Sequence, residues 1–353
     1  MPLDPVFSER LRVHRRYLFS QALQLARARV ESLGLPPRTG RRSPTAAGPS
    51  SRPKGPVPTA RERHRRAARA WDKTELDTVG TPGPDIETRE FTIATPGCPN
   101  VRMRAYLPPG PGGRPAVLAF FGGAFRIGGI DYPTTDAANR RRAAEADVIV
   151  LAVDYALAPE HRFPTQVAQG HAALEWLFAH ALELGIDANR VAIAGTSAGA
   201  AIAASVALMN RDRGDLSLRL QLLEVPVVDL TGRHIDLRAT WALGVPAILA
   251  LRELRSIART YLRSRNDSTH PWASPLRAAS HAGLPPAMIL TAQYDPLRGQ
   301  GAAYGHRLRR AGVDATVVQY QGVIHDVPTF TGVLPAARAW HAQVVDTLRG
   351  LHD

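Results

Sequence analysis

The sequence predicts an α/β fold with a mostly parallel central sheet flanked by helices on both faces. Short runs rich in Val, Ile and Leu alternate with helical patterns such as residues 165–180, an order typical of parallel strands joined by covering helices. The chain has 353 residues, 44% of them apolar, which is enough to bury one large core. Two glycine-rich turns that follow expected strands then indicate where chemistry takes place.

The first of these turns surrounds a serine. Residues 195–199 read Gly-Thr-Ser-Ala-Gly and connect the apolar run 190–194 to the small-residue stretch 200–204. We expect a strand, a tight turn and a helix, with Ser197 at the apex. Glycine suits the residue two before the serine and the residue two after it, because such a turn presses these two residues against the adjoining strand and helix. Alone, the pattern is equally consistent with an ordinary small-residue turn.

The second turn follows the expected strand at residues 115–120. Residues 121–125 read Phe-Gly-Gly-Ala-Phe. A serine that attacks a carbonyl needs hydrogen-bond donors for the oxyanion that forms, and glycine-rich backbone facing the serine can supply them. Together the two turns predict a nucleophile with an oxyanion-binding loop.

A serine hydroxyl becomes a good nucleophile only when a base takes its proton and a carboxylate orients that base. On this type of sheet the acid and then the histidine follow the serine along the chain. Asp295 lies after the apolar run that begins at Ala287, and His325 follows the next expected strand, residues 315–320. Of the twelve histidines, only His325 follows a strand in this order.

These residues resemble the hormone-sensitive-lipase family of α/β-hydrolases, the bacterial group IV esterases. Five blocks match in order, at residues 121–125, 154–164 (Asp-Tyr-Ala-Leu-Ala-Pro-Glu-His-Arg-Phe-Pro), 195–200, 295–298 (Asp-Pro-Leu-Arg) and 322–325 (Gly-Val-Ile-His). The resemblance spans about residues 85 to 350. It implies an α/β-hydrolase fold, ester hydrolysis and a helical cap over the active site.

Several positions depart from the family pattern. Phe121 replaces a His that braces the oxyanion loop, so packing is expected to hold the loop here. The other departures are Ala124 for a third Gly, Thr196 for an Asp, Val225 for a Tyr, and Gly299 and Gln300 for an Asp-Glu pair. None removes a group that does the chemistry. Together they suggest a specialised member with a more apolar pocket rim, and we place Phe121, Phe125 and Trp241 at that pocket.

Other ionisable residues could be mistaken for catalytic ones. Asp154, Glu160 and His161 lie in the family's second block, where we favour a structural brace beside the sheet. Asp229 ends another expected strand, over residues 226–229. Chain order and the Asp-Pro-Leu context favour Asp295 as the acid.

The charge is concentrated at the N-terminal end. The whole chain carries a formal net charge of +13, and residues 1–70 hold 16 Lys and Arg against 4 Asp and Glu. We expect an amphipathic helix over residues 8–32, a Pro-, Gly-, Ser- and Arg-rich linker over 36–59, and a second basic helix over 60–71. We favour a solvated cap face; the alternative is binding to an anionic membrane or nucleic acid.

The predicted organisation is therefore an N-terminal region of cap helices and linker, residues 1–84, and a catalytic domain, residues 85–353. A cap insertion is expected at about residues 230–272, with a helix over 243–262 that Trp241 precedes. No apolar run reaches membrane-spanning length, no secretory signal is recognisable, and the single Cys98 excludes an internal disulfide. We expect a cytoplasmic protein with no metal, no cofactor and no nucleic-acid partner, and leave a homodimer open.

The expected function is that of a serine carboxylesterase acting on a small-molecule ester. Ser197 attacks the ester carbonyl, His325 is general base and then general acid, and Asp295 orients the imidazole. Three backbone N–H groups are expected to bind the oxyanion, those of Gly123, Ala124 and Ala198. Two alternatives stay open: a repurposed triad acting on amides or lactones or in a biosynthetic pathway, and a non-catalytic ligand-binding fold. The second is disfavoured because a receptor has no reason to keep Ser, Asp and His.

Overall fold

The computed structural model describes residues 1–10, 12, 58–214, 216–244 and 246–353. Its contacts divide the chain into two compact units, Pro2–His64 and Arg65–Asp353, with Met1 assigned to the second. In the smaller unit residues 5–10 are helical. Most of the helix expected over 8–32, and of the linker expected over 36–59, lies outside the described residues. The second basic helix is present as α2 (Ala60–Thr78), seven residues longer than expected.

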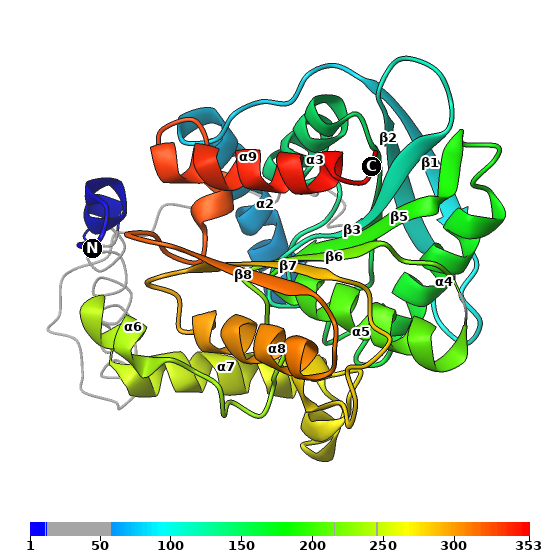
Figure 1. Cartoon of the computed structure of the whole chain (residues 1–353). Helices are drawn as coiled ribbons and strands as arrows, with labels where there is room; N and C mark the ends of the chain where they lie inside the picture. The colour runs from blue at the N-terminus through cyan, green and yellow to red at the C-terminus, as the bar shows by residue number, and fades with distance from the viewer. Residues whose placement is uncertain (11, 13–57, 215, 245) are drawn as a thin grey trace, which may run out of the picture. The chain divides into compact units, whose positions relative to one another are not determined.

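An eight-stranded sheet forms the centre of the larger unit in its described residues (Figure 1). The strands are β1 (Glu87–Ile93), β2 (Val101–Leu107), β3 (Arg114–Phe120), β4 (Ile149–Asp154), β5 (Ile186–Thr196), β6 (Leu220–Glu224), β7 (Ala287–Ala292) and β8 (Ala315–Tyr320). Their order across the sheet is β1-β2-β4-β3-β5-β6-β7-β8. β2 pairs antiparallel with β1 and β4, and the pairs from β4 to β8 are parallel, as the sequence predicts.

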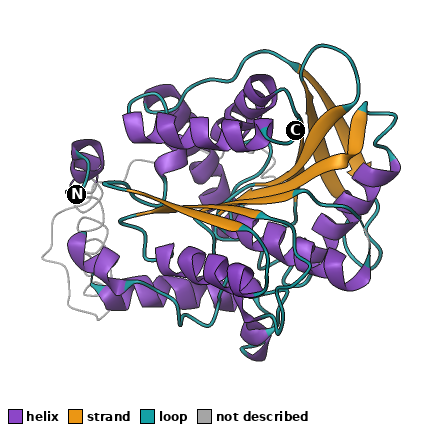
Figure 2. Cartoon of the chain, in the orientation of Figure 1, coloured by secondary structure: helices purple, strands orange, loops and turns teal. Residues whose placement is uncertain are grey.

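Helices cover both faces of this sheet (Figure 2). They are α3 (Pro133–Ala146), α4 (Thr165–Ala179), α5 (Ala198–Arg213), α6 (Leu237–Ala242), α7 (Ala247–Tyr261), α8 (Arg298–Arg310) and α9 (Pro335–Arg349), with short 3-10 turns η1 (Asn266–Thr269), η2 (Pro275–Arg277) and η3 (Val327–Thr329). α3 and α9 lie on one face, and α4, α5 and α8 on the other. Within the described part of the chain, none of the helices combines the length and apolar character needed to span a bilayer.

The central strands are largely apolar because helices bury them from both sides. Six of the seven residues of β3 are buried, and so are the first five of β4. α5 is buried from its first residue to Asn210, which its run of alanines permits because small side chains let the helix lie close to the sheet. At the sheet edge, β8 has no fully buried residue.

Two sequence expectations about the segments after β5 are wrong. Residues 226–229 are not a strand, because β6 ends at Glu224. Val225 has a left-handed backbone with φ +42° and Pro226 has no N–H to donate, so the ladder stops there. The helix expected over residues 243–262 begins only at Ala247, because Pro246 precedes it, and Trp241 belongs to the separate short helix α6.

Candidate active site

Four parallel strands end at the same edge of the sheet and lead into the candidate site residues. β3, β5, β7 and β8 all run parallel in the stretch from β4 to β8, so their carboxyl ends lie on one side. Loops that leave these ends carry the glycine-rich segment 121–125, Ser197, Asp295 and His325. In open α/β sheets this edge is where ligands bind.

Ser197 occupies a strained turn between β5 and α5. Its backbone has φ +55° and ψ −113°, a conformation that residues other than glycine rarely adopt. A β-carbon at Gly195 would come within 2.3 Å of the Gly199 carbonyl carbon, and one at Gly199 within 2.1 Å of the Phe120 carbonyl oxygen. The spacing of the two glycines therefore has the steric cause expected from the sequence.

The serine, histidine and aspartate form one chain of hydrogen bonds. Ser197 Oγ lies 2.9 Å from His325 Nε2, and His325 Nδ1 lies 2.7 Å from Asp295 Oδ2. Asp295 is 1% exposed, and its Oδ1 accepts the N–H of Leu297 at 2.9 Å. With its Nδ1–H donated to the carboxylate, the imidazole leaves Nε2 free to accept the serine proton.

The charge on His325 depends on two opposing influences. Burial lowers the pKa of the imidazole, but the negative charge and hydrogen bond of Asp295 outweigh it and raise the pKa to about 9. Asp326 adds a smaller effect in the same direction. An imidazole with a raised pKa stays protonated to a higher pH than an ordinary histidine does.

Because a protonated imidazole cannot accept the serine proton, we expect kcat/KM for an ester to rise with pH and to reach half its maximum near pH 9. Removing the carboxylate in Asp295→Asn should move this midpoint down toward the ordinary histidine value of about 6.5. A pH–rate profile of the two proteins tests this. A wild-type midpoint at or below pH 7 would contradict the assignment of a raised pKa to His325.

The glycine-rich loop after β3 lies against the serine turn. A β-carbon at Gly122 would be 3.5 Å from Ser197 Cβ, so the two backbones are in close approach. Gly123 has φ +135°, and a side chain there would meet the Ile127 carbonyl oxygen at 2.0 Å. Ala124 has φ +54°. The left-handed conformations of both residues turn the backbone sharply after β3.

Aromatic stacking supports both ends of this loop. The Phe121 ring stacks on Tyr155, with centroids 4.1 Å apart, and the Tyr155 hydroxyl donates to the Phe121 carbonyl oxygen at 2.8 Å. Phe125 stacks on Tyr261 of α7 with centroids 3.8 Å apart. Packing thus replaces the usual histidine brace, as the sequence suggested.

Residues 117–329 match a family model described as the alpha/beta hydrolase fold. The chain belongs to this family. The chain is 36% identical over 267 residues to Esterase LipI of Mycobacterium tuberculosis. The match covers 72% of this chain and 79% of LipI. The structure of EstE1, a thermophilic carboxylesterase cloned from a metagenomic library, matches with a TM-score of 0.76 at 34% identity. The match covers 84% of this chain and 98% of the EstE1 chain. A hyperthermophilic esterase from Pyrobaculum calidifontis matches with a TM-score of 0.78 at 30% identity. The match covers 100% of this chain and 99% of that esterase.

In this α/β-hydrolase the acidic residues of the second block contact structural partners. Asp154 accepts from the Arg102 guanidinium at 3.1 Å and from the Ile130 N–H at 3.4 Å. Glu160 pairs with Arg65 at 2.7 Å, and Arg65 also donates to the carbonyl oxygens of Arg126 and Ala158. These contacts are those of a brace beside the sheet.

Asp229 is buried but lies in a hydrogen-bond group separate from the triad. Its Oδ1 accepts from the backbone and hydroxyl of Thr231, and its Oδ2 lies 2.8 Å from His234 Nδ1. Its backbone exchanges two hydrogen bonds with the side chain of Gln300, one of the positions that depart from the family pattern. The structure therefore brings His325 together with Asp295 and not with Asp229.

The three aromatic residues expected at the pocket lie in different surroundings. Phe121 and Phe125 are 7% and 1% exposed and support the loop through their stacked partners. Trp241 is 77% exposed on α6. The structure does not bring these three side chains together.

Sequence analysis missed a carboxylate beneath the serine turn. Glu224, 1% exposed at the end of β6, accepts from Arg142 at 2.7 Å, from the Trp340 indole at 2.6 Å and from the Thr196 hydroxyl at 3.1 Å. Its backbone oxygen accepts the Ser197 N–H at 2.8 Å. A charged residue inside the apolar run Leu-Leu-Glu-Val-Pro was the signal that could have found it.

We expect Glu224→Gln to lower the free energy of unfolding by about 3 kcal/mol, because it leaves Arg142 largely buried without its counter-charge. The matched control is Glu253→Gln, which removes an ion pair with Arg126 from a side chain that is 61% exposed and should cost about 1 kcal/mol or less. Urea unfolding of both variants measures the difference. Equal losses in the two variants would contradict the role given to Glu224.

Proposed function

We propose that this protein is a carboxylic ester hydrolase that works through an acyl-enzyme on Ser197. The observation that carries this proposal is the hydrogen-bonded series Ser197–His325–Asp295, with 2.9 Å and 2.7 Å between the heavy atoms, at the carboxyl-end edge of the parallel strands. Similarity to esterases and carboxylesterases supports the same reaction class.

The reaction follows from the roles of these three side chains. Ser197 Oγ attacks the ester carbonyl while His325 Nε2 accepts the hydroxyl proton. The tetrahedral intermediate collapses, the carbon–oxygen bond to the alcohol breaks, and His325 returns the proton to the departing alkoxide. A water molecule then gives its proton to His325 and attacks the acyl-enzyme, which releases the carboxylic acid and restores Ser197. The buried Asp295 carboxylate stabilises the imidazolium in both halves.

The oxyanion of each intermediate needs donors at the carboxyl end of β3 and the start of α5. Gly123 and Ala124 lie on the loop whose neighbour Gly122 touches the serine turn, and Ala198 is the first residue of α5, where a helix leaves its N–H groups without internal partners. We assign these three N–H groups to the oxyanion. One such donor contributes about 2.7 to 4 kcal/mol to lowering the barrier in measured cases.

We further propose that residues 230–272 form a cap over the acyl side of the site. α7 carries Tyr261, which stacks on Phe125, and Glu253, which forms an ion pair with Arg126 of the same loop. Ile248 and Leu249, at the other end of α7, are 72% and 51% exposed. Apolar groups that α7 leaves exposed suit a substrate with an apolar acyl chain.

A series of p-nitrophenyl esters with acyl chains from acetate to palmitate, measured beside the matching p-nitroanilides, tests the proposed function. We expect turnover of the esters with a maximum at one chain length, and much slower turnover of the anilides because their leaving group is the poorer one. Folded protein that turns over none of the esters would overturn the proposal. Faster turnover of the anilides would reassign the triad to amides.

A further inference from the structure

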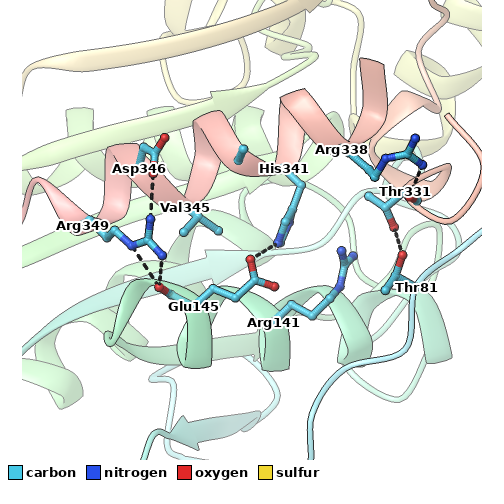
Figure 3. Close-up of a pocket in the computed structure, with 10 residues that line it drawn as sticks. Thr81, Arg141, Glu145, Thr331, Arg338, His341, Val345, Asp346 and Arg349 are labelled. Atoms are coloured by element: carbon cyan, nitrogen blue, oxygen red, sulfur yellow. Dashed lines mark hydrogen bonds and ion pairs between the residues drawn. The ribbon is translucent and has the colours of Figure 1, made fainter. Parts of the chain in front are cut away.

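A cavity lined by none of the triad residues lies between α3 and α9 (Figure 3). Its volume is about 320 Å³, within the range of small-ligand sites. α3 and α9 cover the face of the sheet opposite α5, the helix that follows the nucleophile (Figure 1). The residues that line the cavity are Thr81, Arg141, Glu145, Thr331, Arg338, His341, Ala342, Val345, Asp346 and Arg349.

Arg141 is the feature of this cavity that needs an explanation. The residue is 8% exposed, its buried Nε has no hydrogen-bond partner among the described residues, and Glu145 acts on it only as a nearby negative charge. Figure 3 shows the side chain rising from α3 toward α9, between His341 and Thr81. Buried cations are normally paired, because removing an unpaired charge from water is costly.

Of the other charged groups in the cavity, Glu145, Asp346 and Arg349 have charged or hydrogen-bonded partners, whereas Arg338 has no carboxylate partner among the described residues. Glu145 lies 3.0 Å from His341 Nε2, and its backbone oxygen accepts from Arg349, which pairs with Asp346 at 2.9 Å. Arg338 donates to the Thr331 carbonyl oxygen at 3.4 Å and to no carboxylate among the described residues. Arg141 and Arg338 therefore line the cavity without an ion pair to a carboxylate of any described residue.

The protonation states strengthen this imbalance. Burial and the neighbouring Arg142 lower the pKa of Arg141 to about 10, so the guanidinium remains charged at neutral pH. Burial and the nearby Arg141 and Arg142 lower the pKa of His341, against the opposing effect of its hydrogen-bond partner Glu145. With His341 neutral, three arginines face two carboxylates, a net charge of +1.

We propose that the cavity between α3 and α9 binds a small oxyanion, a carboxylate or a phosphate, through Arg141. The planar guanidinium presents paired N–H groups that match two oxygens of such a group. Arg338 and the hydroxyls of Thr81 and Thr331 line the same cavity and supply further donors. The bound anion gives Arg141 the hydrogen-bonded counter-charge that the described residues do not.

Isothermal titration with inorganic phosphate and, separately, with sodium acetate at constant ionic strength tests the proposal. We expect saturable binding of one equivalent, with the tighter of the two ions identifying the source of the oxyanion. At ten times the dissociation constant that ion should raise the melting temperature by about 2 °C. Because phosphate also stabilises proteins by exclusion from their surface, the effect must be compared with variants.

Two variants of Arg141 and one control complete the test. Arg141→Met keeps the apolar stem and removes the charge, so anion binding and the anion-dependent melting shift should both disappear. Arg141→Lys keeps the charge without the fork and should bind at least fivefold more weakly. Arg310→Gln removes one positive charge from an exposed residue on α8, on the opposite face of the sheet, and should bind as wild type does.

The thermal stability of Arg141→Met in anion-free buffer is a second, independent test of the proposal. If the guanidinium lacks a protein partner, replacing it should leave the melting temperature in anion-free buffer unchanged or higher. A large decrease there would show that Arg141 has a structural partner, and would overturn the proposal. Equal anion binding by wild type and Arg141→Met, or no saturable binding of either ion, would also overturn it.

Discussion

Ser197→Ala should lower kcat for a p-nitrophenyl ester by about 10^6-fold, the loss measured for a triad serine in a well-studied protease. The substitution removes one oxygen atom, the nucleophile. The residue itself is largely buried, at 9% exposure, and the turn fixes its backbone. The melting temperature should therefore stay within about 2 °C of wild type, since the main chain and the packing around it do not change. Steady-state kinetics and thermal unfolding of the purified variant measure the two effects.

Ser205→Ala is the matched control. Ser205 also lies on α5, is 1% exposed, and donates its hydroxyl to the Ala201 carbonyl oxygen one turn earlier. Its removal should leave kcat unchanged because it touches no member of the triad. If the Ser197 variant retained more than a few per cent of the wild-type rate, the serine could not be the nucleophile.

Asp295→Asn should lower kcat by about 10^4-fold while the fold is retained. The amide would donate to His325 Nδ1 where the carboxylate accepts, which favours the tautomer with its hydrogen on Nε2. That nitrogen could then no longer accept the serine proton. The variant would also lack the negative charge of Asp295, which stabilises the imidazolium across the 2.7 Å contact with His325 Nδ1.

Asp229→Asn separates this effect from the loss of any buried carboxylate. Asp229 is as buried as Asp295, at 1% exposure, and also contacts a histidine, but that histidine is His234. We expect near-wild-type kcat and a cost in stability of about 1 to 3 kcal/mol. A catalytic loss in the Asp229 variant beside an active Asp295 variant would exchange the two assignments.

The parts of the site that sequence analysis located are those set by local geometry. The strand at residues 315–320 was expected with the bounds that the structure has, and the turn at Ser197 was expected because only glycine fits beside it. Chain order then singled out Asp295 and His325, which β7 and β8 bring to the same edge as β5.

The missed features depend on contacts between distant segments. Glu224 has partners on α3 and α9, over eighty residues away on either side, and no local pattern announces such pairing. The end of β6 before Pro226 and the break before Pro246 could have been read from the prolines, but the apolar pattern continued across both. The exposure of Trp241 and the unpaired Arg141 likewise follow from how helices pack on the sheet, which one sequence does not specify.

The most direct test of the central claim is to trap the serine. A p-nitrophenyl alkylphosphonate should react once per active site, because Ser197 Oγ attacks phosphorus, p-nitrophenolate leaves, and the phosphonyl-enzyme resists hydrolysis. Mass spectrometry should then find one adduct per chain, on the peptide that contains Ser197, with ester turnover lost in proportion and no adduct on Ser197→Ala. An adduct on a different residue, or full labelling that leaves ester turnover intact, would contradict the assignment of Ser197 as the nucleophile.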